Sequence, residues 1–139
     1  MTMAPEMTAV KETGPASGLE VQIRLPGGGG WLAVCDLDLL LPGRGVAALL
    51  PGGDQVALFR DRAGRLYAID NRDPFGGAAV LSRGLTGTHA GRAFVASPLL
   101  KQRFDLRSGR CLDEEGVGVR VYEVRAATAS AGPGRGGAR

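Results

Sequence analysis

The chain has 139 residues, with 17 lysines and arginines against 14 aspartates and glutamates, and a single histidine. Its net charge of +3 comes without a run of like charges and without aromatic residues interleaved with basic ones, so no pattern indicates nucleic-acid binding. Two cysteines are too few for a disulfide-scaffolded secreted domain, no apolar segment approaches the ~20 residues that span a bilayer, and no signal-peptide pattern is present. We therefore expect a cytoplasmic protein without membrane association.

Glycine is unevenly distributed along the chain. Ten of the 23 glycines lie outside residues 31–125, six before this range and four after it. Ordering glycine-rich backbone has a high entropic cost and offers almost no surface to bury. The composition predicts disordered tails at 1–30 and 126–139, and one folded domain at 31–125. Roughly 95 residues suffice for a modest core without metal or disulfide support.

Short apolar stretches separated by turn residues predict strands at the start of this domain. A strand is expected at 31–35, and a single helical turn at 36–41 that Asp36 would cap. Two hairpins should follow, with turns at 51–54 and 61–64.

In the second hairpin, the residues of the returning strand alternate between two faces. A strand places successive side chains on opposite sides of a sheet. The alternation predicts Tyr67 and Ile69 on one face, and Leu66 and Ala68 on the other.

Residues 71–91 are interrupted by glycine and proline too often for a regular element. They predict a long irregular loop, and such loops in compact domains are usually functional. Further strands are expected at 92–97, 102–106, 110–112 and 117–124. About eight or nine short strands and no long helix predict an all-β fold, either an antiparallel sandwich or a small barrel.

Two stretches resemble the cluster-binding segments of Rieske iron–sulfur domains. Residues 95–111, VASPLLKQRFDLRSGRC, resemble the pattern C-P-x-H-x-x-x-F-D-x-x-T/S-G-x-C. Residues 81–84, LSRG, resemble the L-S-x-G that follows the first C-x-H ligand pair. The resemblance implies a Rieske-like β-fold.

The ligand positions of this pattern carry other side chains. A Rieske [2Fe–2S] centre needs two cysteine thiolates and two histidine imidazoles. Ser97 stands where the resemblance places a cysteine, Leu100 stands where it places a histidine, and residues 71–76 contain neither ligand type. Because His89 is the one histidine of the chain, a two-histidine ligand set is excluded. We expect no cofactor and no metal in this chain.

Over the whole folded stretch, the chain is similar to the small subunits of assimilatory NADH-dependent nitrite reductases. The segments N-R-D-P-F and S-P-L-x-K-Q are specific, because each occupies a position where a true Rieske protein carries ligands. The similar segments are WLAVC (31–35), PGRGVAAL (42–49), QVALFR (55–60), YAIDNRDPF (67–75), VLSRG (80–84) and ASPLLKQ (96–102).

This resemblance implies an accessory subunit of an enzyme that reduces nitrite to ammonium with electrons from NADH, in nitrate and nitrite assimilation. The expected partner is the large catalytic subunit, which would carry FAD, sirohaem and an iron–sulfur cluster. The isolated chain would have no catalytic site. An alternative stays open, because fold does not fix function: a stand-alone Rieske-like interaction module unconnected with nitrite.

The candidate partner interface is the pair of degenerate cluster loops, which should meet at one tip of the fold. Two interpretations stay open: the tip is a docking surface for a larger redox subunit, or Phe75, Leu99 and Leu100 fill the vacated cavity. Burying three such side chains would contribute roughly 5–9 kcal/mol before entropy costs. Arg72 and Lys101 are expected to be exposed. The candidate residues are Asn71, Arg72, Asp73, Pro74, Phe75, Ser97, Pro98, Leu99, Leu100, Lys101 and Gln102.

The histidine, the two cysteines and one acidic run are not expected to form a functional site. His89 is expected in a solvent-facing turn, and Cys35 and Cys111 are expected to behave as small apolar residues. The acidic run at 113–115 precedes a glycine and predicts a solvated turn.

Overall fold

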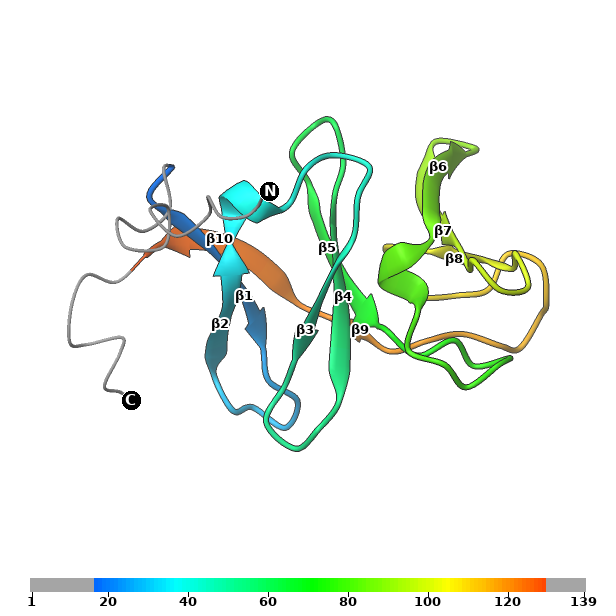
Figure 1. The fold of residues 1–139 in the computed structure, drawn as a ribbon, viewed down its shortest axis with the longest axis horizontal. Helices are drawn as coiled ribbons and strands as arrows, with labels where there is room; N and C mark the ends of the chain where they lie inside the picture. The colour runs from blue at the N-terminus through cyan, green and yellow to red at the C-terminus, as the bar shows by residue number, and fades with distance from the viewer. Residues whose placement is uncertain (1–16, 130–139) are drawn as a thin grey trace, which may run out of the picture.

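The structure is a computed structural model that describes residues 17–129. Within this range, ten strands and two short 3₁₀ helices form three antiparallel sheets that follow one another along the molecule (Figure 1). The strand orders are β10-β1-β2, β3-β4-β5-β9 and β6-β7-β8. The all-β fold of short antiparallel strands that the sequence predicts is confirmed. No helix in the described range is long and apolar enough to cross a membrane.

The elements have the following bounds: β1 (Leu19–Arg24), β2 (Trp31–Asp36), η1 (Leu37–Leu39), β3 (Val46–Leu49), β4 (Gln55–Arg60), β5 (Leu66–Asp70), η2 (Leu81–Arg83), β6 (Leu85–His89), β7 (Arg92–Ala96), β8 (Arg103–Asp105), β9 (Val121–Tyr122) and β10 (Val124–Thr128).

Strand β1 corrects the expected start of the domain. It lies inside the predicted tail at 1–30, yet it is the central strand of its sheet, and Val21 and Ile23 are fully buried. The glycine run at 27–30 belongs to the hairpin turn into β2, which the Leu25 N–H closes by donating to the Gly30 carbonyl at 2.8 Å. The prediction was wrong for residues 19–24, because a glycine-rich turn and a glycine-rich tail have the same composition. Residues 1–16 lie outside the described range.

The carboxyl-terminal boundary is also shifted. Strand β10 passes the expected end at residue 125, and Thr128 lies opposite Leu19 of β1. The predicted tail at 126–139 is therefore wrong for residues 126–128, and residues 130–139 lie outside the described range. The single final strand expected at 117–124 is also incorrect, since only Val121–Tyr122 pairs with β5 before β10 begins.

The middle sheet separates two hydrophobic cores, and strand β4 is buried on both faces. Val56 and Leu58 face the core shared with the β10-β1-β2 sheet, whereas Ala57 and Phe59 face the core shared with the β6-β7-β8 sheet. The neighbouring strand confirms the predicted alternation. Leu66 and Ala68 belong with the first core, and Tyr67 and Ile69 belong with the second.

Three local expectations agree with the structure only in part. The helical turn near Asp36 is present as the 3₁₀ helix η1, but the Asp36 side chain makes no capping hydrogen bond. The long irregular loop is wrong for residues 85–89, which form β6 and pair with β7. The strand expected at 110–112 is reduced to isolated bridges, of which one joins Phe104 to Cys111.

Candidate functional site

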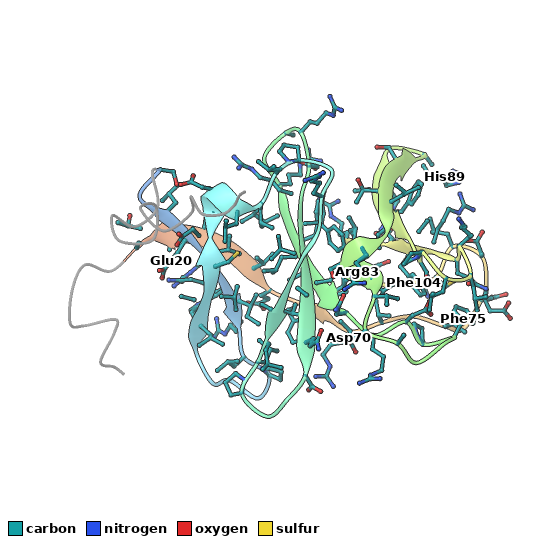
Figure 2. All side chains as sticks on the ribbon, viewed as in Figure 1. Glu20, Asp70, Phe75, Arg83, His89 and Phe104 are labelled. Carbon is teal, nitrogen blue, oxygen red and sulfur yellow. The ribbon has the colours of Figure 1, made fainter. Side chains whose placement is uncertain are left out.

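The two degenerate cluster loops meet at one end of the molecule. Residues 71–76 follow β5, and residues 97–102 join β7 to β8; together we call them the tip loops. A Cβ atom added to Gly76 would lie 3.5 Å from Leu99 Cδ1, so the loops are in van der Waals contact. Phe75 lies at the end of the molecule opposite Glu20 (Figure 2).

A buried hydrogen bond joins the two tip loops. Asp73 and Ser97 are both fully buried, and the Ser97 hydroxyl donates to Asp73 Oδ2 at 2.5 Å. The other carboxylate oxygen accepts a hydrogen bond from the Phe75 N–H at 2.8 Å, and Ser97 Oγ accepts one from the Leu99 N–H at 3.3 Å. Each residue therefore organises its own loop and links it to the other loop.

These residues also have the spacing of Rieske ligands. Asp73 and Phe75 are separated as in the C-x-H pair, and Ser97 and Leu100 as in C-P-x-H. The four side chains offer one carboxylate, one hydroxyl and two hydrocarbon groups, whereas a Rieske centre requires two thiolates and two imidazoles. The donor set does not fit a [2Fe–2S] cluster. Elsewhere in the described range, no group of three or more His, Cys, Asp or Glu side chains has the arrangement of a metal site.

The aromatic and aliphatic side chains of the tip take opposite directions. Phe75 is half-buried and packs against the second core, with its ring centroid 6.2 Å from that of Phe104. Leu99 and Leu100, in contrast, are 50% and 56% exposed. Of these three side chains, only Phe75 therefore packs into the interior, whereas the two leucines present apolar surface to solvent.

The remaining candidate residues hold or border the loops. Asn71 is buried, donates through its amide nitrogen to Gln55 Oε1 at 3.0 Å, and accepts the Ser82 N–H at 2.7 Å, which fixes the first loop to β4 and η2. The guanidinium of Arg72 donates to the Gly77 carbonyl and closes the same loop.

In the second loop, the Ser97 N–H donates to the Gln102 carbonyl at 2.9 Å, and the Lys101 N–H donates to the Ser97 carbonyl at 3.0 Å. Lys101 has a φ of +69°. As expected, Arg72 and Lys101 are exposed; Pro74 and Pro98 are exposed as well.

The other residues considered in the sequence lie away from the tip loops. His89 is exposed at the end of β6. Cys111 is buried in the second core, and Cys35 is half-buried in β2. Burial, and to a smaller extent the nearby Asp36 carboxylate, raises the pKa of the Cys35 thiol to about 11. Cys35 therefore lacks the low pKa of a reactive thiolate, and Cys111 lacks the exposure of one.

The acidic run at 113–115 is more structured than a solvated turn. The Asp113 carboxylate forms an ion pair with Arg103 at 2.8 Å and accepts the Arg103 backbone N–H, also at 2.8 Å. These contacts hold the pKa of Asp113 below its ordinary value, chiefly through the Arg103 side chain. The pair clamps the end of the β8 hairpin beside the second tip loop.

Comparison with known proteins identifies the structural class of the chain. Residues 30–130 match the family of Rieske-like [2Fe-2S] domains, in agreement with the three-sheet β-fold and the paired tip loops. The small subunit of nitrite reductase (NADH) from Salmonella typhimurium is 50% identical over 96 residues, which are 68% of this chain and 88% of that protein.

A solved structure agrees with this match. The putative NADH-dependent nitrite reductase small subunit from Mycobacterium tuberculosis superposes with a TM-score of 0.60 at 48% identity, covering 68% of this chain and 91% of that one. The chain belongs to the family of nitrite reductase (NADH) small subunits. A large subunit of nitrite reductase [NAD(P)H] from Klebsiella oxytoca also contains a similar segment, 46% identical over 95 residues, which covers 68% of this chain and 10% of that protein.

Proposed function

We propose that the chain is an accessory subunit of NADH-dependent nitrite reductase, and that it binds and supports the large catalytic subunit during nitrite assimilation. The donor set at the tip supports a role other than electron transfer, because Phe75 and Leu100 offer no ligand atom to a cluster. FAD, sirohaem and an iron–sulfur cluster would then reside in the large subunit, which reduces nitrite to ammonium.

The exposed pair Leu99 and Leu100 carries this proposal. The two adjacent leucines lie on a turn that the buried Ser97 holds in place, so the apolar surface is presented by a fixed backbone. Each leucine would gain roughly 1.5–3 kcal/mol from full burial. A pre-organised apolar anchor flanked by the charged Lys101 has the composition of a protein–protein contact.

The Klebsiella oxytoca protein supports the choice of partner. That large subunit contains, within its own polypeptide, a segment that is 46% identical to this chain. A separate chain of the same family would occupy the corresponding place through non-covalent contacts. In this proposal, the tip loops supply the surface for these non-covalent contacts.

Co-purification tests the proposal. The full chain, expressed together with the large subunit from the same organism, should co-elute with that subunit. The double substitution Leu99→Ser/Leu100→Ser should weaken the complex at least tenfold, since two apolar anchors are lost. The matched control is Leu39→Ser/Leu49→Ser, which removes two leucines that are 59% and 69% exposed outside the tip loops. Elution of the wild-type chain alone at monomer size would overturn the subunit proposal.

Growth gives an independent readout. Deleting the gene should impair growth on nitrite as sole nitrogen source and leave growth on ammonium unchanged. Normal growth on nitrite would favour the stand-alone interaction module instead.

A further inference from the structure

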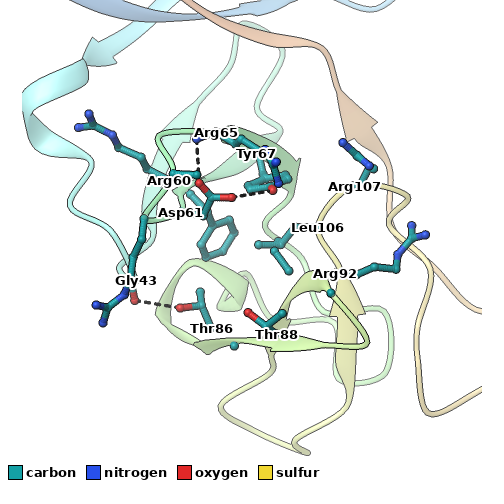
Figure 3. Close-up of a pocket in the computed structure, with 16 residues that line it drawn as sticks. Gly43, Arg60, Asp61, Arg65, Tyr67, Thr86, Thr88, Arg92, Leu106 and Arg107 are labelled. Carbon is teal, nitrogen blue, oxygen red and sulfur yellow. Dashed lines mark hydrogen bonds between the residues drawn. The ribbon is translucent and has the colours of Figure 1, made fainter.

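A cleft of about 520 Å³ lies between the β4–β5 turn and the β6–β7 hairpin (Figure 3). Its apolar floor includes Phe59 and Leu106, both nearly fully buried, and the half-buried ring of Tyr67. Thr86 Oγ donates to the Gly43 carbonyl at 3.3 Å and joins the β6 side of the cleft to the loop before β3. No residue of the tip loops lines this cleft.

The lining of the cleft is strongly basic. It contains five arginines and a single acidic residue, Asp61, which gives a net charge of +4 where the whole chain has +3. The net positive charge of the cleft lining is therefore larger than that of the whole chain. The five arginines are Arg60, Arg62, Arg65, Arg92 and Arg107.

The two acidic residues near the cleft already have partners. The Asp61 carboxylate accepts the Arg65 backbone N–H at 2.8 Å and the Tyr67 hydroxyl at 3.0 Å, so it shapes the turn and fixes the floor. Asp105 lies beneath the rim and pairs with Arg92. Within residues 17–129, no ion pair engages Arg62 or Arg107, and both are exposed.

The arginines are arranged on opposite sides of the apolar floor. In Figure 3, Arg60 and Arg65 lie on the β4–β5 side, and Arg92 and Arg107 lie on the other side. A single phosphate group needs donors that converge on one point, whereas an extended segment with several carboxylates can meet guanidinium groups on both sides. An apolar floor with a tyrosine and an arginine rim also has the composition of an interaction hot spot.

We propose that this cleft receives an acidic peptide segment of the large subunit, whose carboxylates pair with the arginine rim and whose apolar side chain rests on the floor. The inference rests on the proposed function and adds a second contact to it, separate from the tip. The tip would supply apolar burial, and the cleft would supply the charge complementarity that selects and orients the partner.

The test uses the full chain and its large subunit. The double reversal Arg62→Glu/Arg107→Glu should weaken the complex on the order of a hundredfold at low ionic strength, because it places like charges against the acidic segment. Raising the salt concentration from about 0.05 M to about 0.5 M should weaken the wild-type complex. It should also reduce the difference in affinity between the wild type and the variant. Binding is measured by biolayer interferometry, and folding of each variant by circular dichroism.

A matched control separates the cleft from the overall charge. Arg83→Glu/Arg110→Glu makes the same change in net charge at two exposed arginines that do not line the cleft. This variant should bind within about threefold of wild type at the same ionic strength. If both double charge reversals reduced the affinity for the large subunit equally, the proposal that the cleft is the binding site would be overturned.

The outcomes distinguish this inference from the proposed function. A complex that forms normally with Arg62→Glu/Arg107→Glu refutes the cleft and leaves the subunit role standing, whereas the absence of any wild-type complex refutes the subunit role itself. Hydrogen exchange on the complex should protect an acidic segment of the large subunit. Titration of the isolated chain with inorganic pyrophosphate, followed by NMR, should give only weak millimolar shifts at the rim; saturation at micromolar concentration would identify a phosphate site and overturn the peptide assignment.

Discussion

Ser97 and Asp73 link the two tip loops by a hydrogen bond, and the resemblance to Rieske domains places Ser97 at a cysteine position. The link lies in a fully buried environment, where the carboxylate also accepts a backbone N–H from Phe75. A hydrogen bond to a charged acceptor is stronger than one between neutral groups. At the residue scale, a buried polar contact therefore joins the two tip loops.

Removing the Ser97 hydroxyl tests this role. Ser97→Ala leaves a buried carboxylate oxygen without its donor, so we expect the free energy of unfolding to fall by roughly 1.5–3 kcal/mol, a large share of the net stability of a small domain. Urea denaturation measures the change. Ser108→Ala, at an exposed turn, is the control and should cost less than about 1 kcal/mol. Equal losses in the two variants would show that the buried bond has no special weight.

The Cys35 thiol gives a second test at the scale of one residue. Its pKa is raised to about 11, chiefly by burial, and only the thiolate reacts with alkylating reagents. At pH 8 the thiolate fraction should be on the order of a hundredfold smaller than for an ordinary thiol, so alkylation should be slow and should keep accelerating up to about pH 11. Peptide mass spectrometry separates Cys35 from Cys111, and the urea-unfolded chain is the control. A rate that levels off near pH 9 would contradict the burial.

At the scale of single elements, prediction from the sequence succeeded where one local signal decided the outcome. The β4–β5 hairpin follows from its turn residues, and the alternation at 66–69 correctly assigned its side chains to two faces. Strands β1 and β6 were missed, because glycine residues next to or inside them resembled tails and loops. Strand β1 pairs with the distant strand β10, which local composition does not encode, whereas β6 pairs with the neighbouring strand β7 in a hairpin that the glycine-rich composition concealed.

The tip shows the same limit. The sequence located both loops and the missing ligand types, and it left the direction of Phe75 and the two leucines undecided. That direction depends on which side chain reaches Phe104, a neighbour brought close by the packing of β8. The arginine cleft was not predicted at all, since its lining comes from four separate stretches of chain.

The backbone of the second tip loop supplies a prediction for this element. Lys101 has a φ of +69°, in the left-handed region that costs a non-glycine residue about 1–2 kcal/mol. Lys101→Gly removes this strain, while the extra freedom of glycine in the unfolded chain returns part of the gain. We expect a net stabilisation of up to about 1 kcal/mol by urea denaturation. Lys101→Ala, which keeps a Cβ atom and removes the charge, should stay within about 0.5 kcal/mol of wild type; a glycine variant less stable than the alanine variant would refute the strain.

At the scale of the whole molecule, two cores share the middle sheet, and the strand missed in the sequence closes the first of them. A chain cut to 31–125 lacks β1 and most of β10, so β2 loses its sheet partner and the core loses Val21 and Ile23. These two side chains alone contribute roughly 3–6 kcal/mol of burial. The cut chain should therefore be unfolded by circular dichroism, whereas a chain of residues 17–129 should fold. A cooperative unfolding transition for 31–125 would show that these residues fold on their own, as the sequence predicted.

The tip also permits a test of how closely the molecule keeps the geometry of a cluster-binding domain. If the tip loops meet as Rieske loops do, restoring the ligands by Asp73→Cys, Phe75→His, Ser97→Cys and Leu100→His should be sufficient for a cluster to form. After incubation with iron and sulfide, the fourfold variant should turn brown and hold iron and sulfide in equal amounts. The wild-type chain and the threefold variant that keeps Leu100 should remain colourless under the same treatment, because each lacks part of the ligand set. A fourfold variant that is folded yet colourless would mean that the tip has diverged in backbone as well as in side chains, and a brown wild type would refute the conclusion that the donor set does not fit the cluster.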